Sequence, residues 1–243
     1  MNNLKSPINP NQLTPLAIIA IVVAIIFAGL LTILVINILA MSQRIKDSAL
    51  DINQYQQVVL KDQLTATYTP ELAAIVEGEN SPWFGSPSAK IVIVEFADFA
   101  CPYCNQAYPA LRQIGVKYQD KVKIIFRDRP GFEDSIALSM AAHCADDQGK
   151  FWPMHDKLYE QYSPELAADV NNLTTIAQQI GLDVDELTKC ISAQKYLDKI
   201  ENDFVDAQSL GVLGTPTWFV NGQKMEGVVT LAEWESIINQ LID

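Results

Sequence analysis

The chain has 243 residues, which is enough for one domain with a substantial core and an accessory segment. Its first 42 residues contain Lys5 and no acidic side chain, so the remaining chain carries 16 basic against 29 acidic side chains. Such an excess of negative charge repels phosphate backbones and argues against nucleic-acid binding. Its simplest role is to keep a soluble domain in solution.

The N-terminal part of the chain predicts a membrane anchor. Residues 1–15 are polar with three prolines and are expected to be a disordered tail. Residues 16–41 contain no charged side chain, and about 20 apolar residues suffice to span a bilayer core. A cleaved signal peptide is the alternative, but its apolar region is usually only ~7–15 residues long. The pattern therefore favours an uncleaved transmembrane helix.

The orientation of that helix is not given by its flanking charges. Lys5 precedes the apolar run, whereas Arg44 and Lys46 follow it. The positive-inside rule therefore does not predict which end of the helix is cytoplasmic.

Residues 42–85 are expected to connect the anchor to the domain as a spacer helix and a linker. Ile45, Ile52 and Val59 recur every seven residues, which predicts a helix with one apolar stripe. A short dimerising coiled coil is the alternative, but the intermediate core positions are poor for it. The prolines and glycine between Tyr68 and Lys90 indicate a linker.

A strand followed by two cysteines dominates the rest of the sequence. The β-branched run from residue 91 to 97 is typical of a buried strand. Helical signals resume after Cys104, so Cys101 is expected at the first turn of a helix. Unpaired N–H groups and the helix dipole favour a thiolate there. A low thiol pKa is what makes a cysteine reactive.

The remaining elements follow in the order strand, helical block, hairpin and helix. Residues 101–118 should form a helix with Leu111, Ile114 and Val116 on its buried side. Asn221 and Gly222 are a strong hairpin signal. The other expected elements are a strand at 121–127, helices from 134 to 209, strands at 217–220 and 223–228, and a helix at 231–241.

The Cys-x-x-Cys pair alone is compatible with redox chemistry or with half of a metal site. The chain has only two histidines, His143 and His155, so a tetrahedral zinc site has few possible ligands and no metal is expected. His143 is adjacent to Cys144, but adjacent residues of a helix face different directions. His155, Phe151 and Trp152 are interpreted as packing residues. A strand before the pair, a helix after it and a distant Thr-Pro dipeptide favour redox chemistry.

Three motifs together resemble the DsbA-like thioredoxin-fold family. They are Glu-Phe-Ala-Asp-Phe-Ala-Cys-Pro-Tyr-Cys at 95–104, Gln-Gly-Lys-Phe-Trp at 148–152 and Gly-Val-Leu-Gly-Thr-Pro-Thr-Trp-Phe-Val-Asn-Gly at 211–222. The similarity covers roughly residues 86–243. It implies an α/β thioredoxin fold, interrupted by an all-helical insertion over about 134–209.

The resemblance also implies roles for individual residues. Cys101 would be the exposed nucleophile that forms a mixed disulfide with substrate, and Cys104 would resolve it. Pro216 would be the family's cis-proline, and Thr215 before it would contact substrate. Glu95 would be a buried acid that moves protons near Cys104, although a strand-end carboxylate in a salt bridge is an equal alternative.

Two further expectations concern the remaining cysteines and the residues inside the motif. Some members of the family carry a second disulfide in the helical insertion, which implies a bridge between Cys144 and Cys190; two buried free thiols are the alternative. Pro102 and Tyr103 would tune the redox pair. Tyr103 stands where the best-known relatives have histidine, so the pair is expected to be less strongly oxidising.

The resulting hypothesis is a membrane-tethered oxidoreductase that donates a disulfide to proteins outside the cytosol, where disulfides are stable. Expected partners are reduced or misoxidised extracytoplasmic proteins and a membrane redox protein, with no cofactor. The expected location is the bacterial cytoplasmic membrane, with the domain on its outer side. The alternatives are a reductase or isomerase with the same site, or a non-redox tethered chaperone or copper-binding module.

Overall fold

The computed structural model describes residues 19, 23–40, 43, 68–161 and 170–242, which belong to two units, 1–59 and 60–243. In the first unit, Val23–Ala40 is a helix whose mean hydropathy is 2.8 and which is long and apolar enough to cross a membrane. The predicted tail at 1–15 and the predicted spacer helix lie outside the described residues.

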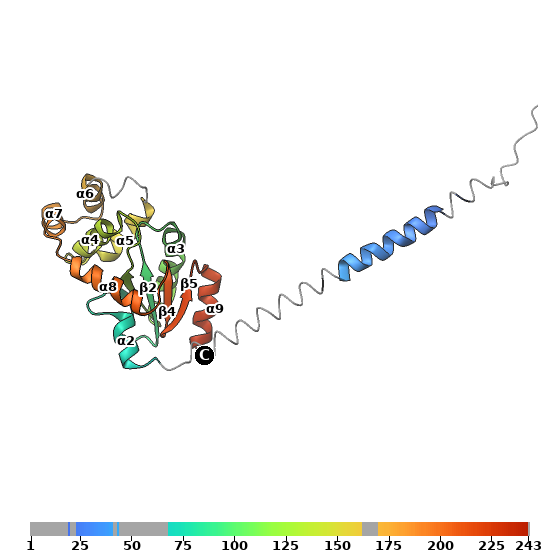
Figure 1. The fold of residues 1–243 in the computed structure, drawn as a ribbon, viewed down its shortest axis with the longest axis horizontal. Coiled ribbons are helices and arrows are strands. Elements are labelled where there is room, and N and C mark those ends of the chain that lie inside the picture. The colour runs from blue at the N-terminus through green and yellow to red at the C-terminus, as the bar shows by residue number, and fades with distance from the viewer. Residues whose placement is uncertain (1–18, 20–22, 41–42, 44–67, 162–169, 243) are drawn as a thin grey trace, which may run out of the picture. The chain divides into compact units, whose positions relative to one another are not determined.

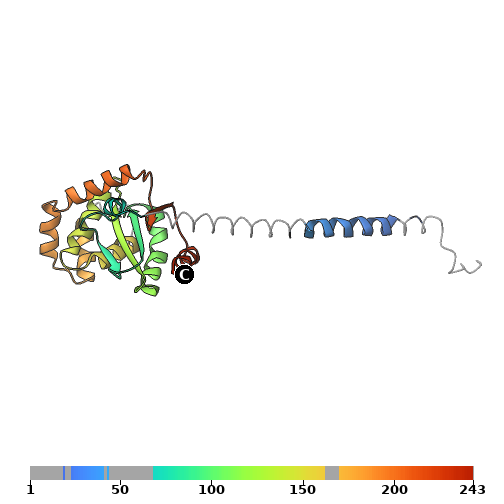
Figure 2. The same ribbon diagram turned by 90° about the horizontal axis from the view of Figure 1, so that it is seen from below.

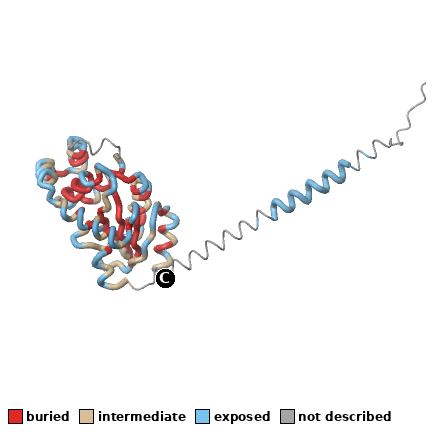
Figure 3. Tube along the Cα trace, viewed as in Figure 1, coloured by how far each residue is buried: buried red, intermediate tan, exposed pale blue. Residues whose placement is uncertain are grey.

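The second unit is built on a five-stranded mixed sheet with the order β1-β3-β2-β4-β5. Strands β2 and β3 are parallel, and the other neighbouring pairs are antiparallel. The central strands are buried, as the red segments in Figure 3 show. The strands are β1 (Trp83–Gly85), β2 (Ile91–Ala97), β3 (Val122–Asp128), β4 (Thr217–Val220) and β5 (Gln223–Glu226).

Helices cover both faces of the sheet (Figures 1 and 2). One face packs against α3 (Pro102–Lys117) and α9 (Leu231–Ile242), and the other against α2 (Pro70–Glu77) and α8 (Leu197–Ser209). Ile93 of β2 belongs to the core on the α3 side, whereas Val94 belongs to the core on the α2 side. Since side chains alternate along a strand, Glu95 lies on the α3 side, toward the cysteines.

A helical block follows β3 and confirms the predicted helical insertion (Figure 1). Besides α8 it comprises α4 (Ser135–Asp146), α5 (Phe151–Glu160), α6 (Val170–Gln179) and α7 (Val184–Ser192). Gly181, whose φ angle is 73°, lies between α6 and α7. Buried residues of α4 and α5 form one hydrophobic cluster with the segment from Phe99 to Cys104. The block therefore forms one wall around the cysteines.

The predicted hairpin at Asn221 and Gly222 is confirmed. Both residues have positive φ angles, 47° and 82°, which two-residue hairpin turns of the primed type require. The turn joins β4 to β5, and β4 leads directly away from Pro216.

The structure corrects the expectation that residues 68–85 are a linker outside the domain. Helix α2 begins at Pro70 behind an N-cap from the Thr69 side chain, and Val76 is completely buried. Strand β1 pairs with β3 at the edge of the sheet. The prolines that indicated a linker thus stand at a helix start and beside a short edge strand, positions that tolerate proline.

One predicted core residue of α3 was assigned to the wrong face. Leu111 and Ile114 are completely buried as expected, but Val116 is 70% exposed. Leu111 and Ile114 lie three residues apart on one helix face, whereas Val116 is two positions further on and points away from it.

Candidate active site

Cys101 lies between the end of β2 and the start of α3. It is the N-cap residue of α3, with extended backbone angles, and its N–H donates to the Asp98 carbonyl at 3.0 Å. The expectation that it is exposed is wrong, because only 4% of Cys101 is accessible and Cys104 is completely buried. Both cysteines are free thiols in this structure.

The segment before β4 brings Thr215 against Cys101 across 114 residues of sequence. The Cys101 Sγ donates to the Thr215 carbonyl at 3.4 Å, which contributes to the low exposure of the thiol. The peptide bond between Thr215 and Pro216 is cis. Tyr103, in contrast, is 62% exposed on the first turn of α3. Tyr103 thus meets solvent directly.

The surroundings of Cys101 stabilise its thiolate. A hydrogen bond from Cys104 lowers the pKa of the Cys101 thiol to about 6, against the opposing effect of burial. The Thr215 side chain and the backbones of Cys104 and Tyr103 add further hydrogen bonds that lower this pKa. These backbone groups of Cys104 and Tyr103 belong to the first turn of α3, where N–H groups have no partner within the helix.

The pKa of the Cys104 thiol is shifted in the opposite direction. Burial raises the pKa of its thiol well above the usual value, and the hydrogen bond to Cys101 and the nearby Glu95 charge raise it further. At neutral pH the pair therefore holds one thiolate, at Cys101, and one thiol, at Cys104. This division is the one that thiol–disulfide exchange requires of an attacking and a resolving cysteine.

Glu95 is a buried acid without a hydrogen-bond partner. Both of its carboxylate oxygens are buried and unpaired, so the salt-bridge alternative is wrong. Its neighbours across the sheet are Phe126 of β3 and Trp218 of β4, which offer the carboxylate no charge. Burial, reinforced by the Cys101 charge, raises the pKa of Glu95 to about 8, so it carries a proton at pH 7.

Two residues at the site were not singled out in the sequence. Asp98 is buried, and its carboxylate accepts the Ala100 N–H at 2.8 Å. Tyr159 of α5 is also buried, and its hydroxyl donates to the Asp98 carbonyl at 3.4 Å. An acidic residue inside an apolar run was the available signal for Asp98. Nothing in the local sequence distinguishes Tyr159, whose position depends on the packing of the helical block.

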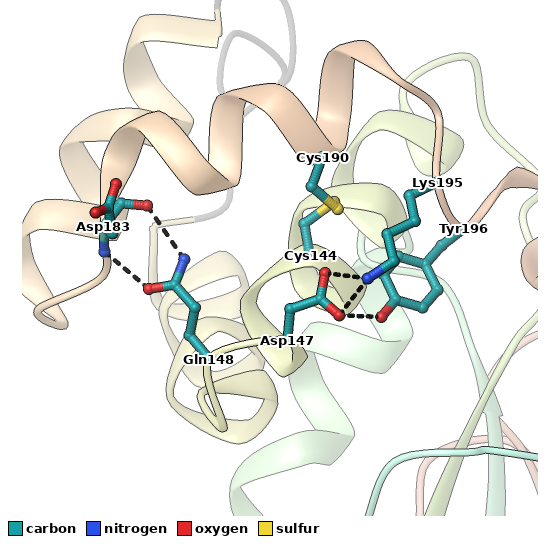
Figure 4. Close-up of a disulfide and its surroundings, with 7 residues drawn as sticks. All are labelled: Cys144, Asp147, Gln148, Asp183, Cys190, Lys195 and Tyr196. Carbon is teal, nitrogen blue, oxygen red and sulfur yellow. Dashed lines mark hydrogen bonds and ion pairs between the residues drawn. A yellow bond between two sulfur atoms is a disulfide. The ribbon is translucent and has the colours of Figure 1, made fainter.

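The second cysteine pair forms a disulfide inside the helical block (Figure 4). Cys144 of α4 and Cys190 of α7 are joined, with 5.8 Å between their Cα atoms. Beside the bridge, Asp147 accepts hydrogen bonds from Lys195 and Tyr196. The expected pairing of Cys144 with Cys190 is therefore present in the structure, and the alternative of two free thiols is not.

The histidines take part in packing and in hydrogen bonds to carboxylates. His143 lies 2.5 Å from an Asp128 oxygen, and His155 is buried among aromatic rings that include Phe99 and Tyr159. Across the described parts of the chain, no three His, Cys, Asp or Glu side chains are grouped so that they could hold a metal ion.

A thioredoxin-type sheet with a reactive dithiol at the start of α3 defines a thiol–disulfide oxidoreductase. Comparison with known proteins agrees with that class. A family model described as Thioredoxin matches residues 77–240, and the chain belongs to this family. Its structural neighbours include a thioredoxin-like oxidoreductase and alpha-DsbA1 from Wolbachia pipientis.

Individual relatives show how far the similarity extends. A thioredoxin-like oxidoreductase from Silicibacter pomeroyi DSS-3 is 27% identical with a TM-score of 0.61, over 69% of this chain and 95% of that one. The thiol-disulfide exchange protein alpha-DsbA2 from Wolbachia pipientis shares the fold at 22% identity, with a TM-score of 0.62, over 77% of this chain and 98% of that one. The Na(+)/H(+) antiporter NhaA 3 of Salinispora tropica is 36% identical over 146 residues, which are 59% of this chain and 22% of that protein. The chain thus spans about a fifth of the length of this curated relative.

Proposed function

We propose that the chain is a membrane-tethered oxidase that donates the Cys101–Cys104 disulfide to reduced proteins outside the cytosol. The observation that carries this proposal is the opposed character of the two thiols, with the pKa of Cys101 lowered to about 6 and that of Cys104 raised. A stabilised thiolate favours the reduced form of the pair, and a pair that is stable when reduced is an oxidant toward its substrates.

The reaction transfers two electrons from the substrate to the cysteine pair. A substrate thiolate attacks Cys101 of the oxidised pair, which breaks the Cys101–Cys104 bond and forms a mixed disulfide. Cys104 leaves as a thiolate and takes a proton. A second substrate thiolate then attacks the substrate sulfur of the mixed disulfide, which releases the Cys101 thiolate and the oxidised substrate.

Glu95 would supply the proton that Cys104 needs. Its pKa of about 8 means that it is protonated at neutral pH, and its charge acts on the pKa of the Cys104 thiol. Because neither carboxylate oxygen has another hydrogen-bond partner, the proton is not held by a competing group. In the reverse direction the same carboxylate would accept the proton from Cys104.

Thr215 and Pro216 would bind the substrate, and Pro102 and Tyr103 would tune the pair. Thr215 already contacts the Cys101 sulfur, so a peptide held beside it would have its own sulfur within reach of Cys101. The exposed Tyr103 adds no positive charge next to the thiolate, which supports a pair less oxidising than one with histidine there.

The apolar helix Val23–Ala40 supports the membrane tether, since it is uncharged and of sufficient length. Turnover would then require a membrane redox protein that reoxidises the pair. A reductase or isomerase would use the same residues but would be kept reduced by its partner. The steady-state redox state of the pair separates these two functions.

The test uses the full chain, purified in detergent and oxidised. It is mixed with a reduced, unfolded substrate protein that contains two thiols, and both proteins are analysed by mass after acid quenching. We expect the substrate protein to gain one disulfide for each Cys101–Cys104 pair that becomes reduced. The Cys104→Ser variant cannot form the Cys101–Cys104 disulfide, so it has no disulfide to donate and should leave the substrate protein reduced. A wild-type chain that stays oxidised while the substrate protein stays reduced contradicts the proposal.

A further inference from the structure

The main chain of Asp98 forms hydrogen bonds with both cysteines. It follows Ala97, the last residue of β2, and only 1% of it is exposed. Its carbonyl accepts the Cys101 N–H at 3.0 Å, and its backbone also hydrogen-bonds to the Cys104 sulfur. The Asp98 Oδ1 accepts the Ala100 N–H at 2.8 Å, which fixes the turn that presents Cys101.

The second carboxylate oxygen of Asp98 reaches a different part of the chain. Oδ2 accepts the Gly131 N–H at 2.7 Å and the Ser135 hydroxyl, also at 2.7 Å. Ser135 Oγ in turn accepts the Phe132 N–H at 2.9 Å. One buried carboxylate thus joins the cysteine turn to residues 129–135, which run from β3 to α4 and are called the brace here. Oδ1 thus serves one donor and Oδ2 serves two.

The brace continues to the segment that contacts the Cys101 sulfur. Arg129 donates its N–H to the Ala97 carbonyl at 2.9 Å and its Nη2 to the Leu213 carbonyl at 3.0 Å. Leu213 lies two residues before Thr215, whose carbonyl accepts the Cys101 thiol. A closed circuit therefore runs from the Asp98 carboxylate through the brace and Arg129 to Thr215, and back to Cys101.

We propose that Asp98 is a positioning residue for disulfide exchange, which acts through the brace to fix Thr215 against the sulfur of Cys101. The inference deepens the proposed function and rests on it, because it assigns a role in exchange at Cys101. Asp98 does not touch the reacting sulfur with its side chain. Its hydrogen bonds instead position Thr215, which contacts that sulfur, and the turn that carries Cys101.

The effect of losing the carboxylate follows from these contacts. Asparagine at position 98 offers one side-chain acceptor where the carboxylate serves three donors, and its NH₂ group would face an N–H or O–H group. If the cysteine turn and the brace separate, Cys101 loses the hydrogen bond from the Thr215 side chain, which lowers its pKa, and part of the N–H donation that stabilises its thiolate. The pKa of Cys101 should then rise toward its usual value.

The experiment compares full-length wild type, Asp98→Asn and Arg129→Met, all in detergent. Thiolate absorbance is followed against pH in the reduced proteins, and the redox equilibrium with glutathione is measured at pH 7. We expect Asp98→Asn to raise the pKa of Cys101 by about one unit. Such a rise makes the pair about fivefold less oxidising at pH 7, because the thiolate then stabilises the reduced form less. Arg129→Met should shift both quantities in the same direction by a smaller amount.

Asp134→Asn is the matched control, because Asp134 belongs to the brace and its side chain makes no capping hydrogen bond. Its Cys101 pKa and glutathione equilibrium should equal those of wild type. The proposal is overturned if Asp98→Asn leaves both quantities unchanged, or if Arg129→Met does, since the circuit passes through both residues. Arg129 is half-buried at the surface, so its variant provides a test even where Asp98→Asn fails to fold. A wild-type chain that transfers no disulfide refutes the proposed function, and the thiolate titration still tests the positioning role.

Discussion

The two cysteine pairs of this chain occupy contrasting surroundings within one folded unit. Cys144 and Cys190 join two helices of the helical block and are bonded to each other. Cys101 and Cys104 lie at the start of helix α3, behind a central strand, as free thiols of which one has a lowered and the other a raised pKa. The difference lies in the neighbours, because only the second pair meets helix N–H groups, Thr215 and a buried acid. Reactivity is thus a property of the site rather than of the cysteines.

Replacing the attacking sulfur should separate the two pairs most strongly. Cys101→Ser should lower disulfide exchange with a reduced substrate protein by roughly three orders of magnitude or more, as removal of a covalent nucleophile does. The double variant Cys144→Ala/Cys190→Ala should keep the wild-type rate constant. Initial rates of substrate oxidation measure both. Exchange that survives in Cys101→Ser, or disappears in the double variant, would reverse the assignment of the pairs.

Removing the bridge should affect stability instead of exchange. In the chain-entropy treatment, a disulfide across the 46-residue separation of Cys144 and Cys190 contributes about 4 kcal/mol. Urea unfolding of Cys144→Ala/Cys190→Ala should show a loss of that size relative to wild type. An unchanged midpoint would mean that the helical block is held by packing alone.

Glu95→Gln should stabilise the reduced protein and flatten its pH dependence. The pKa of Glu95 is about 8 in the folded chain and ordinary when unfolded. Below about pH 4.5 the carboxyl is protonated in both states and does not lower the free energy of unfolding. As the pH rises toward about 8, the unfolded state releases this proton more easily, so the folded state loses stability relative to it. At pH 7 the buried carboxyl costs about 3 kcal/mol. The variant should therefore gain about that much at pH 7 and little at pH 4.5. Unfolding curves at the two pH values check this, and equal gains at both would contradict the account.

Disulfide exchange by Glu95→Gln tests whether Glu95 gives a proton to Cys104. Glutamine cannot give a proton to Cys104, so the step in which Cys104 leaves should slow while Cys101 still reacts with thiol reagents at its wild-type rate. Stopped-flow measurement of the two steps distinguishes them. A variant that is slow in both steps would indicate general damage to the site.

The smallest expected effect belongs to Tyr103→His. A histidinium beside the Cys101 thiolate attracts it by up to about 1 kcal/mol in a water-like medium, so the glutathione equilibrium should move by up to about fivefold toward a more oxidising pair. Since Tyr103 is exposed, its replacement should leave the unfolding midpoint unchanged. A less oxidising pair in Tyr103→His would contradict the role given to this position.

The sequence indicated most of what is local in this structure. The β-branched run became β2, the Asn221–Gly222 turn became a hairpin, and the helical signals became α4 to α8. These features depend on patterns within a few residues. The resemblance to DsbA-like proteins added the juxtaposition of Cys101 with Thr215, which no local pattern could supply.

What the sequence did not indicate depends on contacts between distant segments. The role of Asp98 is visible only once Gly131 and Ser135 lie beside it. Residues 68–85 were mistaken for a linker because the pairing of β1 with β3 cannot be recognised from three residues. The low exposure of Cys101 likewise follows from a segment that is 114 residues away.

The direction of electron flow is tested most directly by the redox state of the Cys101–Cys104 pair in living cells. Cells that express the full chain are quenched in acid, the free thiols are alkylated with a heavy reagent, and the chain is separated by mass. The account predicts that most molecules carry Cys101 and Cys104 as a disulfide at steady state. A pair that is mostly dithiol, beside an intact Cys144–Cys190 bridge, would contradict the oxidase assignment and support a reductase or isomerase.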